Sequence, residues 1–454
     1  MRFATVAAAL VCATSLSGPA WAESLPFAPL PSDFRTDSID VVALGRHLFF
    51  DPVLSGNDNI SCASCHHPAL GSADGLSLGV GEGGVGLGAE RKIEAKNRPV
   101  QRIPRNAPAL FNVGAAEFTT MFHDGRVALD SSAMYGVKMP AGRDLERPVP
   151  SALAAQNILP LLSHDEMAGH EGENPVADAI AANKIQGPDG AWALIANEIS
   201  EIPEYRAMFD WQIGKDTPVH ITDIGRALSA FITYEFRSVN SPFDAYLRGY
   251  DAALNDAQMR GMELFYGPAN CSSCHSGKFQ TDHQFHSIGL PQVGPGKPDE
   301  TGLASNAASD LGRAHVTGKA EDTYRFRTPS LRNVELTGPY GHNGAYASLE
   351  AMVRHHLDPL TGLGKYDRAQ AVLASMEDDK VQDWTAMDDF SEVLRIAASV
   401  ELKTTKLTDS EVADLMAFLG ALTDPIAKTG RLGVPARVPS GLPLDPIGAL
   451  NTSY

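Results

Sequence analysis

The chain has 454 residues, of which 43% are hydrophobic and 20% are charged. This length predicts two or three domains with substantial apolar cores, which excludes a disordered tail or a disulfide-stapled mini-protein. Acidic residues outnumber basic ones by 55 to 37, giving a formal charge of −18, and this surplus argues against a nucleic-acid partner, because a nucleic-acid binder presents a basic face.

The N-terminus is typical of an export signal. Arg2 is followed by an apolar run over residues 4–16 and then by an Ala-Trp-Ala ending at 20–22. One positive charge, a short apolar core and this ending predict a Sec signal peptide cleaved after Ala22. The alternative, a buried N-terminal helix, leaves the ending unexplained. The run is too short to span a bilayer, so we expect an exported periplasmic protein of Gram-negative type, with no membrane anchor.

The cysteines follow a repeated pattern. Of the five, Cys12 lies in the predicted signal, and the other four belong to two C-x-x-C-H units. This pattern is the attachment signature of c-type haem, in which two thiols bind the porphyrin and the histidine binds iron. A four-cysteine zinc site would not need a histidine after each pair, and a thioredoxin-like pair would need a βαβ context. The sequence therefore predicts two covalent haems, held by Cys62, Cys65 and His66 and by Cys271, Cys274 and His275.

Similar segments surround the two units and suggest an internal duplication. The segment Gly45–Phe50 precedes the first unit and Gly261–Tyr266 precedes the second, each as the end of a helix. Amphipathic helices are predicted to close the two halves, over Ile221–Phe236 and over 409–422 with Asp409 as N-cap.

These patterns predict a mostly α-helical protein built from two cytochrome-c-like haem domains. Gly/Pro-rich loops, notably 71–88 and 291–302, separate the helices, and 238–242 is the expected linker. The predicted division is a signal peptide at 1–22, an N-terminal domain with the first haem at 23–240 and a C-terminal domain with the second haem at 241–454.

Beyond these units, the sequence resembles the bacterial diheme cytochrome c peroxidase family, which includes the methylamine-utilisation enzyme MauG. The resemblance extends from about Asp40 to Asp424. It rests on Leu48-Phe-Phe-Asp51, Leu54-Ser-Gly-Asn57, Ser61-Cys-Ala-Ser-Cys-His66, Arg105-Asn-Ala-Pro108, Phe122-His-Asp-Gly-Arg126, Arg327-Thr-Pro-Ser-Leu-Arg-Asn333 and Pro339-Tyr-Gly-His-Asn-Gly344.

The resemblance implies that the first haem is peroxidatic, with a distal glutamine and, ten residues later, a distal glutamate. Gln156 and Glu166 stand at that spacing, with Pro160 between them. Peroxide must lose a proton from one oxygen and gain one on the other before its O–O bond breaks. A carboxylate beside the iron can move that proton, and an amide can orient the peroxide. The alternative is that Glu166 is an ordinary helix-start acid and Gln156 a surface amide.

For the second haem, the resemblance implies His275 as proximal ligand and His356 as distal ligand. The family has Met or Tyr at the distal position. Adjacent residues of a helix point about 100° apart, so only one of His355 and His356 can face the iron. His342 and Met352 are the fallback ligands. An iron with two histidines is saturated and suits electron transfer. The alternative is that both histidines are solvated helix residues.

The resemblance also implies a calcium ion between the haems. Asn106, Thr337 and Pro339 match that site, which uses one amide side chain and two backbone carbonyls, and oxygen ligands suit Ca²⁺. His123 stands where the family has a tryptophan between the haems, so a route through an indole is in doubt.

Family members that need reductive activation carry a histidine in the loop after the first haem. This chain has no histidine between His67 and His123. We therefore expect the first haem to be open in the resting diferric state, as in MauG, and we expect His67 to be a surface residue.

The sequence thus favours a periplasmic enzyme that reduces hydrogen peroxide with electrons from a small donor protein. The runner-up is a MauG-like oxidase that oxidises Trp or Tyr side chains of a substrate protein, and the third reading is a diheme electron carrier. A monomer or a homodimer fits each of them.

Overall fold

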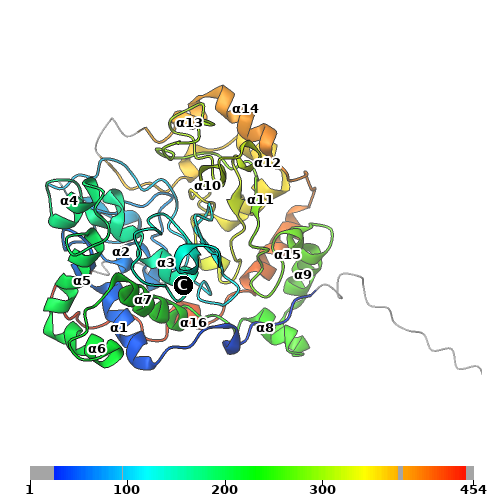
Figure 1. Cartoon of the computed structure of the whole chain (residues 1–454). Helices are drawn as coiled ribbons and strands as arrows, with labels where there is room; N and C mark the ends of the chain where they lie inside the picture. Colours follow the sequence, from blue (N-terminus) through cyan, green and yellow to red (C-terminus); the bar gives the residue numbers. More distant parts are fainter. Residues whose placement is uncertain (1–24, 95, 377–381, 446–454) are drawn as a thin grey trace, which may run out of the picture.

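The computed structural model describes residues 25–94, 96–376 and 382–445. The predicted signal peptide lies outside the described residues. Helices and long loops dominate, and every strand is two or three residues long, which confirms the expected mostly helical fold (Figure 1). Within the described ranges, no helix combines the length and the apolar character needed to cross a bilayer.

The longer helices form two groups, one on each side of the chain's midpoint, and short helices carry the loops between them. The strands pair antiparallel in three small sheets, ordered β1-β2, β3-β4-β5 and β6-β7. The helices are α1 Ile39–Phe50, α2 Cys62–Cys65, α3 Ala152–Asn157, α4 Pro175–Ala181, α5 Ala191–Glu201, α6 Pro203–Ile213, α7 Ile221–Glu235, α8 Pro242–Leu247, α9 Asp256–Tyr266, α10 Ala314–Thr317, α11 Leu349–Leu357, α12 Pro359–Gly364, α13 Thr385–Asp388, α14 Phe390–Ser399, α15 Asp409–Gly420 and α16 Ile426–Thr429. The strands are β1 Gly84–Val85, β2 Lys92–Ile93, β3 Thr120–Met121, β4 Val127–Leu129, β5 Val137–Lys138, β6 Phe285–His286 and β7 Phe326–Arg327.

Each half contains the same close crossing of two helices. In the first half, α1 crosses α7 at Gly45, where a Cβ would lie 1.8 Å from the carbonyl oxygen of Ala227. In the second half, α9 crosses α15 at Gly261, where a Cβ would lie 1.9 Å from the carbonyl oxygen of Asp414. Only glycine fits at such a backbone contact. The repeated sequence pattern therefore corresponds to a repeated packing, and in each half the crossing precedes a C-x-x-C-H unit.

The predicted closing helices form, with one correction. α7 ends at Glu235, one residue before the predicted end. α15 begins at Asp409, but its N-cap is Thr408, whose hydroxyl accepts a hydrogen bond from the Glu411 N–H while the Glu411 carboxylate accepts one from the Thr408 N–H. The prediction of Asp409 as N-cap was wrong because this reciprocal capping box selects the threonine.

The apolar core of the first half is extended by the far end of the chain. After α16, the chain returns to α1 and α7 (Figure 1), and Val438 is buried in the first core with only 1% of its surface exposed. The last described residues thus pack against the N-terminal half, whereas the predicted domain division assigns them to the C-terminal one. The division itself stays a prediction.

Charged side chains fasten this returning segment. The buried Glu235 carboxylate accepts hydrogen bonds from the N–H groups of Arg431, Leu432 and Gly433, at 2.7–3.1 Å. The Arg46 guanidinium donates to the carbonyls of Leu432 and Gly433. The Glu235 carboxylate therefore binds N–H groups of the stretch 431–433, and the Arg46 guanidinium binds its carbonyl groups.

The loop over 127–150 is also part of the first core. Its strand β4 pairs with β3, with Met121 opposite Val127, and its strand β5 pairs with the other edge of β4. Val137 and Leu145 are each 2% exposed. The loop is therefore held against the first core by buried apolar side chains.

Replacing Glu235 with alanine tests the fastening of the C-terminal segment. Hydrogen bonds to a charged group contribute about 1.5–3 kcal/mol, so we expect Glu235→Ala to lower the free energy of unfolding by at least that amount. Denaturant unfolding of the holoprotein measures it. The matched control is Glu201→Ala, an exposed glutamate on α5, which should change stability by less than about 0.5 kcal/mol. Equal stability of the two variants would contradict this account.

Candidate functional site

The first attachment unit is a single helical turn followed by a histidine whose Nε2 is available to bind a metal. α2 carries Cys62 and Cys65, and His66 follows as its C-cap. The His66 Nδ1 lies 3.1 Å from the carbonyl oxygen of Ser72 and donates to it. Because Nδ1 carries the hydrogen, Nε2 keeps its lone pair, which is the form that binds a metal. Burial lowers the pKa of His66, which favours this neutral ring.

A cavity of about 160 Å³ opens onto this unit. Its lining includes both thiols and His66, and it also includes Gln156 and Glu166. Residues about a hundred positions apart therefore meet around one space.

A π-helical turn, η8 (His164–Ala168), carries Glu166 to this cavity. The Gly-rich loop supports the turn, since a Cβ on Gly81 would lie 2.2 Å from the carbonyl oxygen of Asp165. The Glu82 N–H donates to that oxygen, and the Gly56 N–H donates to the carbonyl of Met167. The turn is thus fixed from two sides, and π-helical turns occur frequently at functional sites.

Opposing influences set the proton affinity of Glu166. Burial raises the pKa of its carboxyl, while the positive charges of Arg126 and Lys297 lower it. Both cations line the same cavity. Lys297 comes from the 291–302 loop of the second half, and burial together with Arg105 and Arg126 lowers its own pKa to about 8. A carboxyl with a raised pKa beside a cavity is suited to giving and taking a proton.

The second attachment unit faces another histidine instead of an open cavity. The His275 Nδ1 lies 3.1 Å from the carbonyl of Gln280, so its Nε2 is also free. The ring centres of His275 and His356 are 6.4 Å apart. Two imidazoles that share one metal, with bonds of about 2.0–2.1 Å, place their ring centres roughly 6.2 Å apart. The pair therefore fits a single iron between the rings.

The two neighbouring histidines of α11 have different surroundings. The His356 Nδ1 lies 2.9 Å from the carbonyl of Met352, which leaves its Nε2 free. Both nitrogens of His355 are used, with the Tyr346 hydroxyl 2.9 Å from Nδ1 and the Ile288 carbonyl 2.8 Å from Nε2. His356 has a nitrogen available for a metal and His355 has none. Of the two fallback ligands, His342 stacks on Phe326 with ring centres 3.5 Å apart.

The remaining predicted residues lie in two segments, one between the attachment units and one after the second unit. His123 lines the first cavity, and its Nε2 lies 3.2 Å from the carbonyl of Asn106. Burial and the nearby Arg105 lower the pKa of His123 to about 4, so the ring is neutral. The Asn106 N–H donates to the carbonyl of His342, three residues after Pro339. Asn106 and the segment that carries Thr337 and Pro339 are thus brought together.

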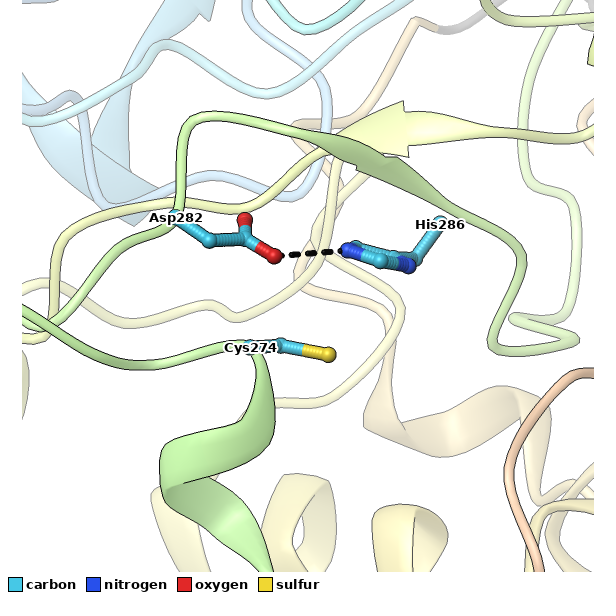
Figure 2. A group of neighbouring side chains, drawn as sticks. All are labelled: Cys274, Asp282 and His286. Atoms are coloured by element: carbon cyan, nitrogen blue, oxygen red, sulfur yellow. Dashed lines mark hydrogen bonds and ion pairs between the residues drawn. The ribbon is translucent and has the colours of Figure 1, made fainter.

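One group of three metal-ligating side chains occurs in the part of the chain that the structure describes. Figure 2 shows Cys274, Asp282 and His286, with the Cys274 sulfur beside the Asp282–His286 ion pair, whose atoms are 2.9 Å apart. The cysteine belongs to the second attachment unit, and the two other side chains already pair with each other. Haem attachment therefore accounts for this cluster without a further metal.

The donor set fits haem and not zinc. Burial raises the pKa of the Cys62 and Cys65 thiols to about 12, so both are neutral thiols in the metal-free chain. All four described cysteines are free, and each pair precedes a histidine whose Nε2 is unused. His66 and His275 would bind the iron of the first and second haem, and His356 would bind the second iron from the other side.

Comparisons with known proteins agree with this arrangement. The family model described as di-haem cytochrome c peroxidase matches residues 40–252. The methylamine utilization protein MauG of Methylorubrum extorquens is 31% identical over 318 residues, covering 70% of this chain and 68% of that protein. The cytochrome c551 peroxidase of Pseudomonas aeruginosa is 30% identical, covering 68% and 69%. The crystal structure of a MauG-like protein associated with microbial copper homeostasis is 26% identical, covers 91% of this chain and 96% of its own, and superposes with a TM-score of 0.56.

The chain belongs to the di-haem cytochrome c peroxidase/MauG family. It is therefore a haem-dependent oxidoreductase of a peroxidase family, as the sequence predicted. The two C-x-x-C-H units are consistent with the two haems of that family.

Sequence reasoning missed two residues that this family member places in its first cavity. Arg126 ends the Phe122-His-Asp-Gly-Arg motif, so that motif could have signalled it. Lys297 carried no signal, because it reaches the cavity only through the packing of a loop from the other half.

The expectation of a surface position for His67 was wrong. Only 2% of His67 is exposed, and its Nδ1 accepts a hydrogen bond from the Ala69 N–H. The ring packs edge-on against Phe50, with ring centres 6.4 Å apart. The residue is buried because it caps the short 3₁₀ turn Pro68–Leu70 that follows the attachment unit.

Replacing His356 separates the two histidines of α11. We expect His356→Ala to convert the second haem from low-spin to high-spin, because the iron loses one of two strong-field ligands. Electron paramagnetic resonance of the resting protein measures the spin state. The control His355→Gln should leave the second haem low-spin, since both nitrogens of His355 bind elsewhere. An unchanged spectrum for His356→Ala would remove it as a ligand.

Proposed function

We propose that this protein is a periplasmic diheme peroxidase, which reduces hydrogen peroxide at the first haem with electrons relayed through the second. The observation that carries the proposal is the contrast between the two sites. His66 shares its cavity with Gln156 and Glu166, whereas His275 faces His356 at a spacing that a single iron fills. One site has room for a substrate and the other does not.

Within this proposal, the side chains of the first cavity manage the proton. The haem iron, when bound, supplies the centre at which the peroxide bond is cleaved. The Glu166 carboxylate takes a proton from the peroxide oxygen that faces the iron and returns it to the outer oxygen. The Gln156 amide orients the peroxide by hydrogen bonding. Arg126 and Lys297 oppose the effect of burial by lowering the pKa of Glu166.

We also propose the calcium ion of the family for the segment between the haems, with the Asn106 side chain and the carbonyls of Thr337 and Pro339 as ligands. The hydrogen bond from the Asn106 N–H to the His342 carbonyl supports it, because it brings these parts together. Oxygen ligands of this kind suit Ca²⁺. The predicted export signal supports a periplasmic location, where a small donor protein would supply the electrons.

A second candidate is a MauG-like oxidase that uses peroxide to oxidise Trp or Tyr side chains of a partner protein. The similarity to the Methylorubrum protein favours it, as does the lack of a histidine between His67 and His123 that could cap the first iron. A diheme electron carrier is less well supported, because it gives no role to the cavity or to the placement of Gln156 and Glu166.

Replacing Glu166 tests the proton transfer. We expect Glu166→Gln to abolish peroxide turnover, because an amide of the same shape cannot accept the proton. Steady-state peroxide consumption with an excess of reductant measures it, and the optical spectrum checks that both haems are loaded. Unchanged turnover would refute the catalytic assignment and leave the electron carrier.

Replacing Lys297 tests how the cations act on Glu166. Turnover needs ionised Glu166 and therefore falls as pH drops through the pKa of its carboxyl. Lys297 is charged below about pH 8 and lowers that pKa. Lys297→Met should therefore raise the pKa and move the acidic limb of the pH–rate profile to higher pH. Lys297→Arg should return the acidic limb to its wild-type pH. An acidic limb that does not move in Lys297→Met would contradict the effect of Lys297 on the pKa of Glu166.

A further inference from the structure

A continuous row of aromatic rings leads away from His356 through the second half. The ring of His355 lies 5.2 Å from that of Tyr346, measured between centres, and the Tyr346 ring lies 5.6 Å from that of Tyr366. The Tyr366 ring lies 6.1 Å from the ring of Trp384. His355 itself is 6.3 Å from His356, the histidine assigned to the second iron. Every step is within the range of direct aromatic contact.

The inner end of the row is a hydrogen-bonded pair. The Nε2–H of His355 donates to the Ile288 carbonyl, so Nδ1 is the acceptor and receives the hydrogen of the Tyr346 hydroxyl at 2.9 Å. Helix α12 leaves room for this pair only because it has glycine at 362, where a Cβ would lie 2.5 Å from the His355 Nδ1. The phenol is buried and has a proton acceptor in place.

The outer end of the row reaches the protein surface. Trp384 is partly exposed, and it stands directly before α13, which lies next to α14 at the top of the view in Figure 1. The guanidinium of Arg368 lies 5.1 Å from its ring centre and pairs with Asp388, so the ring is bordered by one charge of each sign. The Tyr366 hydroxyl donates to the Ala345 carbonyl, which keeps its proton in place.

We propose that Tyr346, Tyr366 and Trp384 form an electron relay between the second haem and the surface, with Trp384 as the contact for donors too large to enter the first cavity. The donor class is a protein or a bulky aromatic reductant that gives up single electrons. This inference rests on the proposed function, because peroxide supplies the oxidising equivalents.

The electrons and protons balance in one-electron steps. Tyr346 loses an electron toward the second haem and its phenolic proton to the Nδ1 of His355. The Tyr346 radical then regains an electron from Trp384 across the ring of Tyr366, and the proton returns from His355. Trp384, now a radical cation, takes an electron from the external donor. Two such passages and two protons from water convert one hydrogen peroxide into two water molecules.

The same rings also fill an apolar core cluster, so packing alone could explain their contacts. Phenylalanine keeps most of that packing but is much harder to oxidise than tyrosine or tryptophan. The variants Tyr346→Phe and Trp384→Phe therefore distinguish a role in electron transfer from a role in packing alone. Trp211→Phe is the matched control, because Trp211 is 77% exposed on α6 and lies outside the row.

The test exposes the holoprotein to a few equivalents of hydrogen peroxide without reductant. Freeze-quenched electron paramagnetic resonance then detects tryptophan and tyrosine radicals, and mass spectrometry locates oxygen added to side chains. The relay predicts oxidation of Trp384 in the wild type and in Trp211→Phe, and its loss in Tyr346→Phe. Equal oxidation of Trp211 and Trp384, or oxidation of Trp384 that persists in Tyr346→Phe, would overturn the relay.

Peroxide consumption in the same samples separates the two proposals. Consumption without oxidation of Trp384 would overturn the relay and leave the peroxidase function standing. If peroxide is not consumed, the proposed function fails, and a ruthenium complex photo-oxidised in solution tests the relay instead by oxidising the reduced haems. Slower haem oxidation in Trp384→Phe than in Trp211→Phe would then support the relay, and equal rates would overturn it.

Discussion

The absence of a side chain at Gly45 and at Gly261 is the constraint on which the two haem sites depend. At each glycine, the helix that leads into an attachment unit touches the backbone of the helix that closes its half. Even an alanine Cβ would lie within 2 Å of a carbonyl oxygen, so a larger residue would push the helices apart. Cys62 follows the end of α1 at Phe50, and Cys271 follows the end of α9 at Tyr266. Each crossing therefore positions the start of the segment that carries the thiols and the proximal histidine.

The two halves then differ in what faces the proximal histidine. In the first half, a turn fixed from two sides brings Glu166 to a cavity that still has empty space. In the second half, α11 places the ring centre of His356 6.4 Å from that of His275. The same scaffold thus holds one site suited to a substrate and one suited to electrons. Lys297, on a loop of the second half, lines the first cavity and links the two.

How much the sequence could predict depends on the range of the interactions involved. The attachment units are local patterns, and the helices that close the two halves follow from apolar periodicity, so both were predictable. His356 needed the register of a family motif. Lys297 and the return of Val438 to the first core depend on packing between distant segments, which leaves no local signal. His67 was misjudged for a related reason, since residue type suggests exposure while a cap buries it.

The central claim is that the first haem is open in the resting protein and the second is saturated. Stopped-flow optical spectroscopy with parallel electron paramagnetic resonance, on the diferric protein mixed with one equivalent of hydrogen peroxide and no reductant, tests it most directly. The account predicts an immediate reaction, with loss of a high-spin haem signal. A protein that stays unchanged until one electron is added would contradict the claim, because its first iron would then be capped.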